Sequence, residues 1–408
     1  MNTKIRLTLM NFLQYAVWGA WLISLGAYLG NTLKFDGLQI GSFFATMGIA
    51  SLFMPAVMGI IADRWIPAQR LLGLCHLFAA GFITLAATRT DYNSLYTLVL
   101  LSVMFYMPTI ALSNSVAYNA LEKAGLDTVT HFPPIRVWGT VGFICAMWVV
   151  DLGKMGLSAT QLYFSATLGL IFGLYSFTLP NCPINRSGGG KSIVDLLGLR
   201  AFALFKQRKM AIFFIFSMLL GMSLQITNAF ADGYIKSFGD TGIHGAKYLG
   251  TFGVEHSTIL ISLSQISETL CILLIPFFLK RFGIKRVMLI AMFAWVLRFA
   301  LLGAGNPGPG VWMFILSMIV YGVAFDFFNI SGSLFVEKET SAAIRSSAQG
   351  VFMIMTNGLG ALIGSYLAGW VVNHYGWPLS WYLFAGFSLV VAIVFAVIFK
   401  YKHDPNRI

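Results

Sequence analysis

The sequence predicts an all-α integral membrane protein, a bundle of twelve transmembrane helices in two six-helix halves. Of its 408 residues, 58% are apolar and only 10% are charged, whereas an ordinary soluble domain is about 25% charged. Apolar runs near 20 residues recur along the whole length, and each is long enough to cross ~30 Å of hydrocarbon as a helix. The longest polar break falls in the middle, with six runs before it and six after it.

The predicted spans cover residues 7–29, 38–62, 70–88, 94–119, 133–151, 159–179, 210–236, 257–279, 285–304, 311–335, 347–372 and 380–399. The fifth is predicted to open at Pro133-Pro134, and the seventh contains the polar residues Gln225, Asn228 and Asp232. The first is too long to be the 7–15-residue apolar core of a cleavable signal, so we interpret it as a span.

Three regions follow from this pattern: an N-terminal half at residues 1–180, a linker at 181–209 and a C-terminal half at 210–408. The linker contains a glycine run and the basic, amphipathic segment DLLGLRAFALFKQRK. Such a segment is expected to lie along the inner membrane surface with its apolar face in the interface.

The net charge of +12 is a topology signal. If both termini are cytoplasmic, the cytoplasmic loops hold 20 Lys and Arg residues and the opposite loops only five: Lys34, Arg89, Lys154, Lys236 and Lys247. This asymmetry is the positive-inside pattern that orients membrane proteins. The basic loops are expected to contact anionic lipid headgroups, and no nucleic-acid role is expected.

Several function classes are disfavoured. The four cysteines are scattered and form no CxxC pair or His/Cys cluster, so neither a disulfide framework nor a metal site is expected. The chain has no HExxH, GxxxxGK[ST] or GxSxG motif, and we therefore expect no enzyme and no bound cofactor. Any transport must then run on an ion gradient or downhill.

Four ionisable residues lie inside predicted spans: Arg136, Glu268, Arg298 and Asp326. A charge at bilayer depth costs about 2.5–3.5 kcal/mol on insertion scales, and such residues mark functional sites by default. Together with the amides and aromatic residues near them, these charges predict a site for a polar substrate near the middle of the membrane.

In the fifth span, Arg136, Thr140 and Phe143 follow i, i+4, i+7 and share one helix face. The alternative is that Arg136 lies at the interface and extends its guanidinium to water. In the seventh, Gln225 and Asn228 are i, i+3, and their amides suit sugar hydroxyls or a base edge. The alternative is hydrogen bonding between helices.

In the eighth span, Gln265 and Glu268 are i, i+3. A carboxylate buried at low dielectric takes up a proton more readily than one in water, so Glu268 is a candidate proton carrier. A structural ion pair of Glu268 with Arg298 is the alternative.

In the tenth span, Tyr321, Phe325 and Asn329 repeat at i+4 beside Asp326. Here two rings could sandwich a planar base while the carboxylate accepts its N–H or ribose hydroxyls. For the aromatic residues alone, a position facing lipid or the core is favoured, and Asp326 is the informative member.

Other polar residues have weaker patterns. Asn11, Gln14, Trp18 and Trp21 in the first span favour helix packing over a cavity lining, as do Gln349, Thr356 and Asn357 in the eleventh. We place the histidines, His76 included, toward span ends or in loops, and interpret them as solvated or structural.

The plan of two six-helix halves with short basic loops resembles the major facilitator superfamily, whose substrate site lies between the halves. The loops GIIADRWIPAQR and PFFLKRFGIKR stand six spans apart, and the first resembles the superfamily's signature loop in shortened form.

Longer stretches are more specific. FLQYAVWGAWL, FPPIRVWGTVGF, LLGMSLQITN, SLSQISETL and IVYGVAFDFFNISGSLFVEKE resemble the bacterial nucleoside:proton symporters of that superfamily. The resemblance implies substrate roles for Arg136, Thr140, Phe143, Gln225, Asn228, Gln265, Glu268, Tyr321, Phe325 and Asp326. The sequence departs from the family mainly in residues 240–253 and 375–377, away from the predicted cavity.

These observations predict a proton-coupled symporter that imports nucleosides such as uridine and adenosine across the bacterial inner membrane by alternating access. Protonation of Asp326 or Glu268 is expected to remove a buried charge and favour binding. The alternatives are a sugar or glycoside symporter and a non-transporting sensor on the same fold. Protons and membrane lipids are the other expected partners, and no obligate protein partner is expected.

Overall fold

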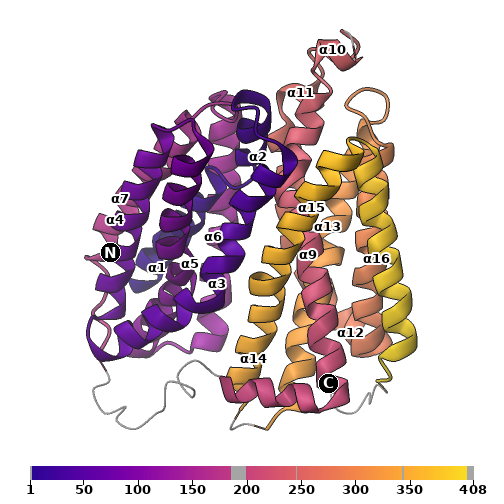
Figure 1. Ribbon diagram of the computed structural model, residues 1–408. Coiled ribbons are helices and arrows are strands. Elements are labelled where there is room, and N and C mark those ends of the chain that lie inside the picture. The colour runs from indigo at the N-terminus through magenta and orange to yellow at the C-terminus, as the bar shows by residue number, and fades with distance from the viewer. Residues whose placement is uncertain (1, 185–198, 245, 342–343, 402–408) are drawn as a thin grey trace. The chain divides into compact units, whose positions relative to one another are not determined.

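The structure is a computed structural model that describes residues 2–184, 199–244, 246–341 and 344–401 (Figure 1). All regular secondary structure in these ranges is helical. The first half of the chain forms α1 (Thr3–Gly19), α2 (Leu25–Ala27), η1 (Tyr28–Thr32), α3 (Gly37–Arg64), α4 (Ala68–Ala87), α5 (Tyr92–Lys123), α6 (Thr128–Leu152) and α7 (Thr160–Ser176). The second half forms η2 (Leu199–Lys206), α9 (Arg208–Ser237), α10 (Thr241–His244), α11 (Phe252–Glu255), α12 (Ser257–Ala304), α13 (Val311–Glu339), α14 (Arg345–Met353), η3 (Ile354–Gly360), α15 (Ala361–Tyr375) and α16 (Leu379–Ile398).

The helices account for all twelve predicted spans. Within the described ranges, nine helical segments are long and apolar enough to cross a membrane. One of them, α12, contains two spans, because Gly283 at φ 74° and ψ 167° separates its two arms, a conformation that suits glycine. The 17-residue helices α1 and α7 supply the remaining two. The predicted all-helical membrane fold is confirmed.

The predicted start of the fifth span is wrong. Helix α6 begins at Thr128, where the carboxylate of Asp127 accepts a hydrogen bond from the Thr130 backbone N–H at 2.8 Å. Pro133 and Pro134 therefore lie inside the helix. Membrane helices tolerate proline, because neighbouring groups satisfy the carbonyls that it frees. As a consequence, Arg136 lies in the third helical turn.

The described residues fall into two compact units. Unit 1 comprises Met1–Phe35 and Thr46–Leu196, and unit 2 comprises Asp36–Ala45 and Leu197–Ile408. The predicted divisions at 1–180, 181–209 and 210–408 stay predictions, since half of the linker lies outside the described ranges.

The described end of the predicted amphipathic segment is η2. Its Leu204 is buried, and its Phe205 ring lies 5.2 Å from the Phe214 ring of α9. This part of the segment therefore packs apolar side chains against protein. Residues 195–198, where the segment begins, lie outside the described ranges.

In unit 1, α1 packs against α6 and α7, and α4 packs against α5 and α7 (Figure 1). Two glycines bring the backbones of α1 and α6 into contact. A Cβ atom at Gly142 would lie 2.1 Å from the Phe12 carbonyl oxygen, and one at Gly19 would lie 2.4 Å from the Phe143 carbonyl oxygen. This approach, typical of small residues in membrane helix pairs, positions Phe143 beside α1.

In unit 2, α12 packs against α13 and α16, while α9 packs against η3 and α15 (Figure 1). A Cβ atom at Gly322 would lie 2.5 Å from the Ser267 carbonyl oxygen. The backbones of α12 and α13 therefore come into contact at Ser267 and Gly322. Glu268 and Tyr321, which are next to these residues along the chain, lie at the same height along the two helices.

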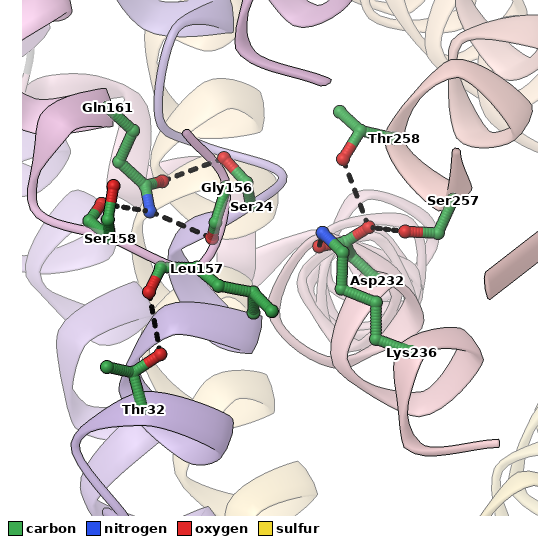
Figure 2. Close-up of polar contacts among 10 residues, drawn as sticks. All are labelled: Ser24, Thr32, Gly156, Leu157, Ser158, Gln161, Asp232, Lys236, Ser257 and Thr258. Carbon is green, nitrogen blue, oxygen red and sulfur yellow. Dashed lines mark hydrogen bonds and ion pairs between the residues drawn. The ribbon is translucent and has the colours of Figure 1, made fainter. Parts of the chain in front are cut away.

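Two buried polar clusters stabilise the ends of the units. In unit 1, the Gln161 side-chain oxygen accepts a hydrogen bond from the Ser24 hydroxyl at 2.7 Å (Figure 2). Its nitrogen donates to the carbonyl oxygens of Gly156 and Ser158 at 3.0 and 3.2 Å. The turn before α7 is thereby held next to the turn before α2.

In unit 2, the corresponding cluster is charged. Asp232 on α9 forms an ion pair with Lys236 at 2.7 Å and accepts hydrogen bonds from the Ser257 and Thr258 hydroxyls (Figure 2). Ser257 and Thr258 begin α12, so this carboxylate fastens α9 to the start of α12. Asp232, which made the seventh predicted span unusually polar, is satisfied within the fold.

Candidate functional site

On α6, the predicted site residues of unit 1 meet the aromatic side chains of α1. The Arg136 guanidinium lies over the Tyr15 ring, 4.0 Å from its centroid, a cation–π contact. Phe143 is buried and meets Trp18 edge-on, with ring centroids 6.3 Å apart. Thr140, one turn before Phe143, is half-buried.

The amides of α1 serve the packing of unit 1. Asn11 donates to the Leu7 carbonyl oxygen of its own helix at 3.0 Å. Gln14 is fully buried and donates to the Thr109 hydroxyl at 2.8 Å. The contacts between helices support the helix-packing interpretation for Gln14, whereas the Asn11 side-chain oxygen has no hydrogen-bond partner among the described residues. Trp18 joins the aromatic residues around Phe143.

The predicted position of His76 is wrong. It was expected toward a span end, but it lies inside α4 and is fully buried. Its Nε2 atom lies 3.1 Å from the Gln14 side-chain oxygen, and its ring centroid lies 4.3 Å from that of Phe172. Its Nδ1 atom has no hydrogen-bond partner among the described residues. No sequence pattern marks this pair, because Gln14 is 62 positions away.

The network around Gln14 extends to the aromatic residues. The Tyr106 hydroxyl donates to the Gln14 backbone oxygen at 2.7 Å, and the Tyr106 ring lies 5.7 Å from the Trp18 ring. A continuous set of contacts therefore leads from His76 through Gln14 and Tyr106 to Trp18 and Phe143.

The amides of α9 lie in unit 2. Gln225 is buried, and its side-chain oxygen has no hydrogen-bond partner among the described residues. Asn228, one turn further on, is half-buried. A buried amide oxygen without a partner is costly, so Gln225 has an acceptor available for a ligand.

The carboxylates of unit 2 lie on facing helices. Asp326 on α13 is only 5% exposed, and its Oδ2 atom has no hydrogen-bond partner among the described residues. Glu268 on α12 lies near enough to interact electrostatically with Asp326. Like charges repel strongly at low dielectric, so the two carboxylates interact unfavourably when both are ionised.

The expected aromatic sandwich on α13 is wrong. The Tyr321 and Phe325 rings stack on each other, with centroids 5.7 Å apart and planes 5° from parallel. Residues four apart on a helix are direct neighbours, so the two rings leave no space for a base between them. Gln265 lies near enough to the Tyr321 hydroxyl to interact with it electrostatically.

Arg298 on the second arm of α12 is fully enclosed by protein. Its Nη1 atom donates to the Ser317 carbonyl oxygen at 2.7 Å, and the Ser264 hydroxyl lies 3.4 Å away. Its guanidinium carbon lies 4.6 Å from the centroid of the Tyr321 ring. The sequence analysis proposed Arg298 as a possible ion-pair partner of Glu268, and in the structure its guanidinium lies against the Tyr321 ring.

A small recess of about 20 Å³ lies in the same unit. It is lined by residues of α9, α12, α13 and η3, among them Leu220, Trp295, Phe325, Asn329, Thr356 and Asn357. Phe325 is the residue that this recess shares with the predicted site. The described residues contain no group of three or more His, Cys, Asp or Glu side chains able to hold a metal ion.

A helical membrane bundle that encloses the Asp326 carboxylate and an unpartnered Gln225 oxygen is typical of membrane transporters. The chain belongs to the family described as Nucleoside H+ symporter, whose profile matches residues 1–404.

Individual relatives agree with this assignment. The nucleoside permease NupG of Escherichia coli (strain K12) is 50% identical over 410 residues, covering 99% of this chain and 97% of the permease. The xanthosine permease of the same strain is 49% identical over 415 residues, covering 100% and 98%. A crystal structure of the nucleoside transporter NupG superposes with a TM-score of 0.91 at 51% identity, covering 98% of this chain and 100% of that chain.

Proposed function

We propose that this chain imports nucleosides together with protons across the bacterial inner membrane by alternating access. The observation that carries the proposal is Asp326: a nearly enclosed carboxylate, near Glu268, with one oxygen that no described residue satisfies. Family membership and the names of the permeases above support the substrate class. Without an ATP-binding motif in the sequence, an ion gradient supplies the energy.

In this proposal the two units have different roles. Arg136, Thr140 and Phe143 of unit 1 and Gln225, Asn228, Gln265, Tyr321 and Phe325 of unit 2 contact the nucleoside. Asp326 carries the proton, and Glu268 is the alternative carrier. Protonation removes a buried charge before the substrate binds, so binding is tightest on the acidic side of the membrane.

Topology follows the charge pattern. Both termini and the basic loops are cytoplasmic in this proposal, and the loops contact anionic lipids. Reporter fusions at each terminus that are active only when cytoplasmic test the orientation.

Uptake by cells that lack their own nucleoside permeases tests the function. Labelled uridine and adenosine should accumulate with an inward proton gradient, and a protonophore should abolish the accumulation. Labelled glucose in the same cells tests the sugar-symporter alternative. Uptake that follows sodium and ignores the protonophore would contradict proton coupling.

A further inference from the structure

Tyr15 on α1 is an aromatic residue that the predicted site did not include, although it contacts one of the members of that site. Its side chain is buried, with 8% of its surface exposed. The carbon at the centre of the Arg136 guanidinium lies 4.0 Å from the centroid of the Tyr15 ring, so the positive charge lies over the ring and is attracted by its electrons. This contact joins α1 to the side chain of α6 for which the sequence predicts a substrate role.

The contact restrains Arg136 without neutralising it. A guanidinium carries five N–H donors and a permanent charge. Within the described ranges, the Arg136 guanidinium has neither a hydrogen bond nor an ion pair. A cation–π contact needs no oxygen acceptor, whereas a carboxylate partner would offset the charge. Arg136 is half-buried and therefore keeps its charge and its hydrogen-bonding capacity for a ligand.

Gly139 provides the space for this contact. It is buried on α6, three positions after Arg136. A Cβ atom at Gly139 would lie 2.6 Å from the Tyr15 Cδ2 atom and 2.8 Å from the Arg136 Nη1 atom. Any larger residue would therefore displace the ring, the guanidinium or both. The contact thus depends on three positions of two helices, and the glycine has a direct steric role in it.

Tyr15 differs in this respect from its neighbour on α1. Trp18 meets the Phe143 ring of α6 edge-on, which is a contact between two neutral groups. Tyr15 instead holds a long and flexible charged side chain, which loses rotamer freedom when a ligand immobilises it. A ring that restrains the guanidinium beforehand reduces this loss on binding.

We propose that Tyr15 is a positioning residue for Arg136: its ring holds the guanidinium in place before the nucleoside binds, and it acts on binding only through that group. This inference rests on the proposed function, in which Arg136 contacts the nucleoside. The face of the ring carries the effect, and the hydroxyl is not required. Because Tyr15 lies in unit 1 and the carboxylates lie in unit 2, the effect falls on affinity and leaves the maximal rate unchanged.

Uptake of labelled uridine by cells that lack their own permeases tests the inference. Tyr15→Leu should raise the KM about three- to tenfold at an unchanged maximal rate, the range expected for loss of one cation–π contact. Tyr15→Phe keeps the ring face, so its KM should stay within about twofold of the unmodified protein. Tyr118→Leu is the matched control. It also removes a ring that packs on α6, since Tyr118 lies 4.6 Å from the Phe132 ring, and it should leave the KM unchanged.

A double-mutant cycle with Arg136 separates positioning from helix packing. In an Arg136→Met background, Tyr15→Leu should change the KM less than about twofold, because the group through which it acts is gone. If Arg136→Met takes up too little uridine for a KM, Arg136→Gln is the background, since it keeps N–H donors and gives the ring no charge to hold. An equal fold-change in both backgrounds would mean that Tyr15 only packs α1 against α6, and would overturn the inference.

Two further results decide the matter. A KM in Tyr15→Phe raised as much as in Tyr15→Leu would overturn the inference, because the hydroxyl would then be the group that acts. Tyr15→Met replaces the leucine variant if that variant does not reach the membrane, since methionine fills space without a ring face, and an unchanged KM in it would also overturn the inference. Absence of nucleoside uptake by the unmodified protein contradicts the proposed function itself, so the two failures are distinguishable.

Discussion

The buried polar network around Gln14 in unit 1 and the buried groups around Arg298 in unit 2 differ in kind. In unit 1, the network inside the helices consists of the amide of Gln14, the hydroxyls of Thr109 and Tyr106, and the imidazole of His76. In unit 2, the helices enclose the Asp326 carboxylate and the guanidinium of Arg298. The recess also lies in unit 2.

Under the proposed function, this difference assigns proton coupling to unit 2 and part of the substrate contact to unit 1. A change of protonation acts most strongly where charges are buried, since a low dielectric amplifies every charge interaction. Under the proposed function, unit 2 is therefore the unit on which the proton gradient acts. Unit 1 offers Arg136 and an aromatic surface around Phe143, which suit contact with a substrate rather than energy coupling.

The largest expected effect comes from Asp326→Asn. The variant keeps the size of the side chain and removes both its charge and its proton site. Uptake against a gradient should be abolished, while exchange of nucleoside down its gradient persists. Accumulation and counterflow in proteoliposomes measure the two separately.

Glu268→Gln is the matched comparison. If Asp326 carries the proton, the protonated protein binds best, so nucleoside affinity should rise as the pH falls from about 8 to 5. Asp326→Asn should flatten this dependence, and Glu268→Gln should keep it. The opposite pattern would assign the proton to Glu268.

The second comparison uses the two arginines. Arg298→Met removes a hydrogen bond from a charged group to the Ser317 carbonyl oxygen, which should cost about 1.5–3 kcal/mol of stability. Arg136→Met removes a half-buried cation–π contact, which should cost about 0.5–1 kcal/mol but weaken nucleoside binding more. Thermal unfolding in detergent, with and without uridine, measures both quantities. Equal loss of stability in the two variants would remove the distinction between the units.

The third prediction concerns the amides of α9. Gln225→Ala and Asn228→Ala should each weaken nucleoside binding by about 1–3 kcal/mol, because a polar group of the ligand loses its buried partner. Expression should stay normal, since the Gln225 oxygen has no partner within the described ranges. Unchanged affinity in well-expressed variants would mean that these amides serve only helix packing.

The sequence was sufficient for the parts of the molecule that depend on local pattern. Apolar length predicted every span, and the rarity of charges inside such spans was enough to single out Asp326 and Arg298. The boundary at Pro133-Pro134 was wrong, because the tolerance of a membrane helix for proline depends on neighbours that the sequence does not locate. The sandwich of Tyr321 and Phe325 was wrong for a geometric reason, because rings at i and i+4 lie against each other.

Other features depend on contacts between distant segments. His76 lies beside Gln14 of another helix, and Asn357 lies in the π-helix Ile354–Gly360. The contact of His76 leaves no periodic signal in the sequence, because it joins segments that are far apart along the chain. The π-helix leaves none either, because it changes the helical period within only a few residues. The spacing of Asn357 in the sequence gave only a weak pattern, and this spacing could not predict that Asn357 lies in a π-helix.

The smallest expected effect tests whether the neutral network of unit 1 positions the aromatic residues around Phe143. Tyr106→Phe removes the hydroxyl that donates to the Gln14 backbone oxygen at 2.7 Å, at a cost of about 0.5–1.5 kcal/mol of stability. Ser102→Ala is the matched control: on the same helix, its buried hydroxyl donates to the Ala79 carbonyl oxygen at 2.9 Å, away from Trp18. Both variants should lose similar stability. Only Tyr106→Phe should raise the KM for nucleosides, by about two- to threefold with an unchanged maximal rate, because a ring freed from Gln14 holds Trp18 and Phe143 less firmly. Equal KM values in the two variants would mean that the network contributes packing alone, and the aromatic surface of unit 1 would then owe its position to the contact of α1 with α6.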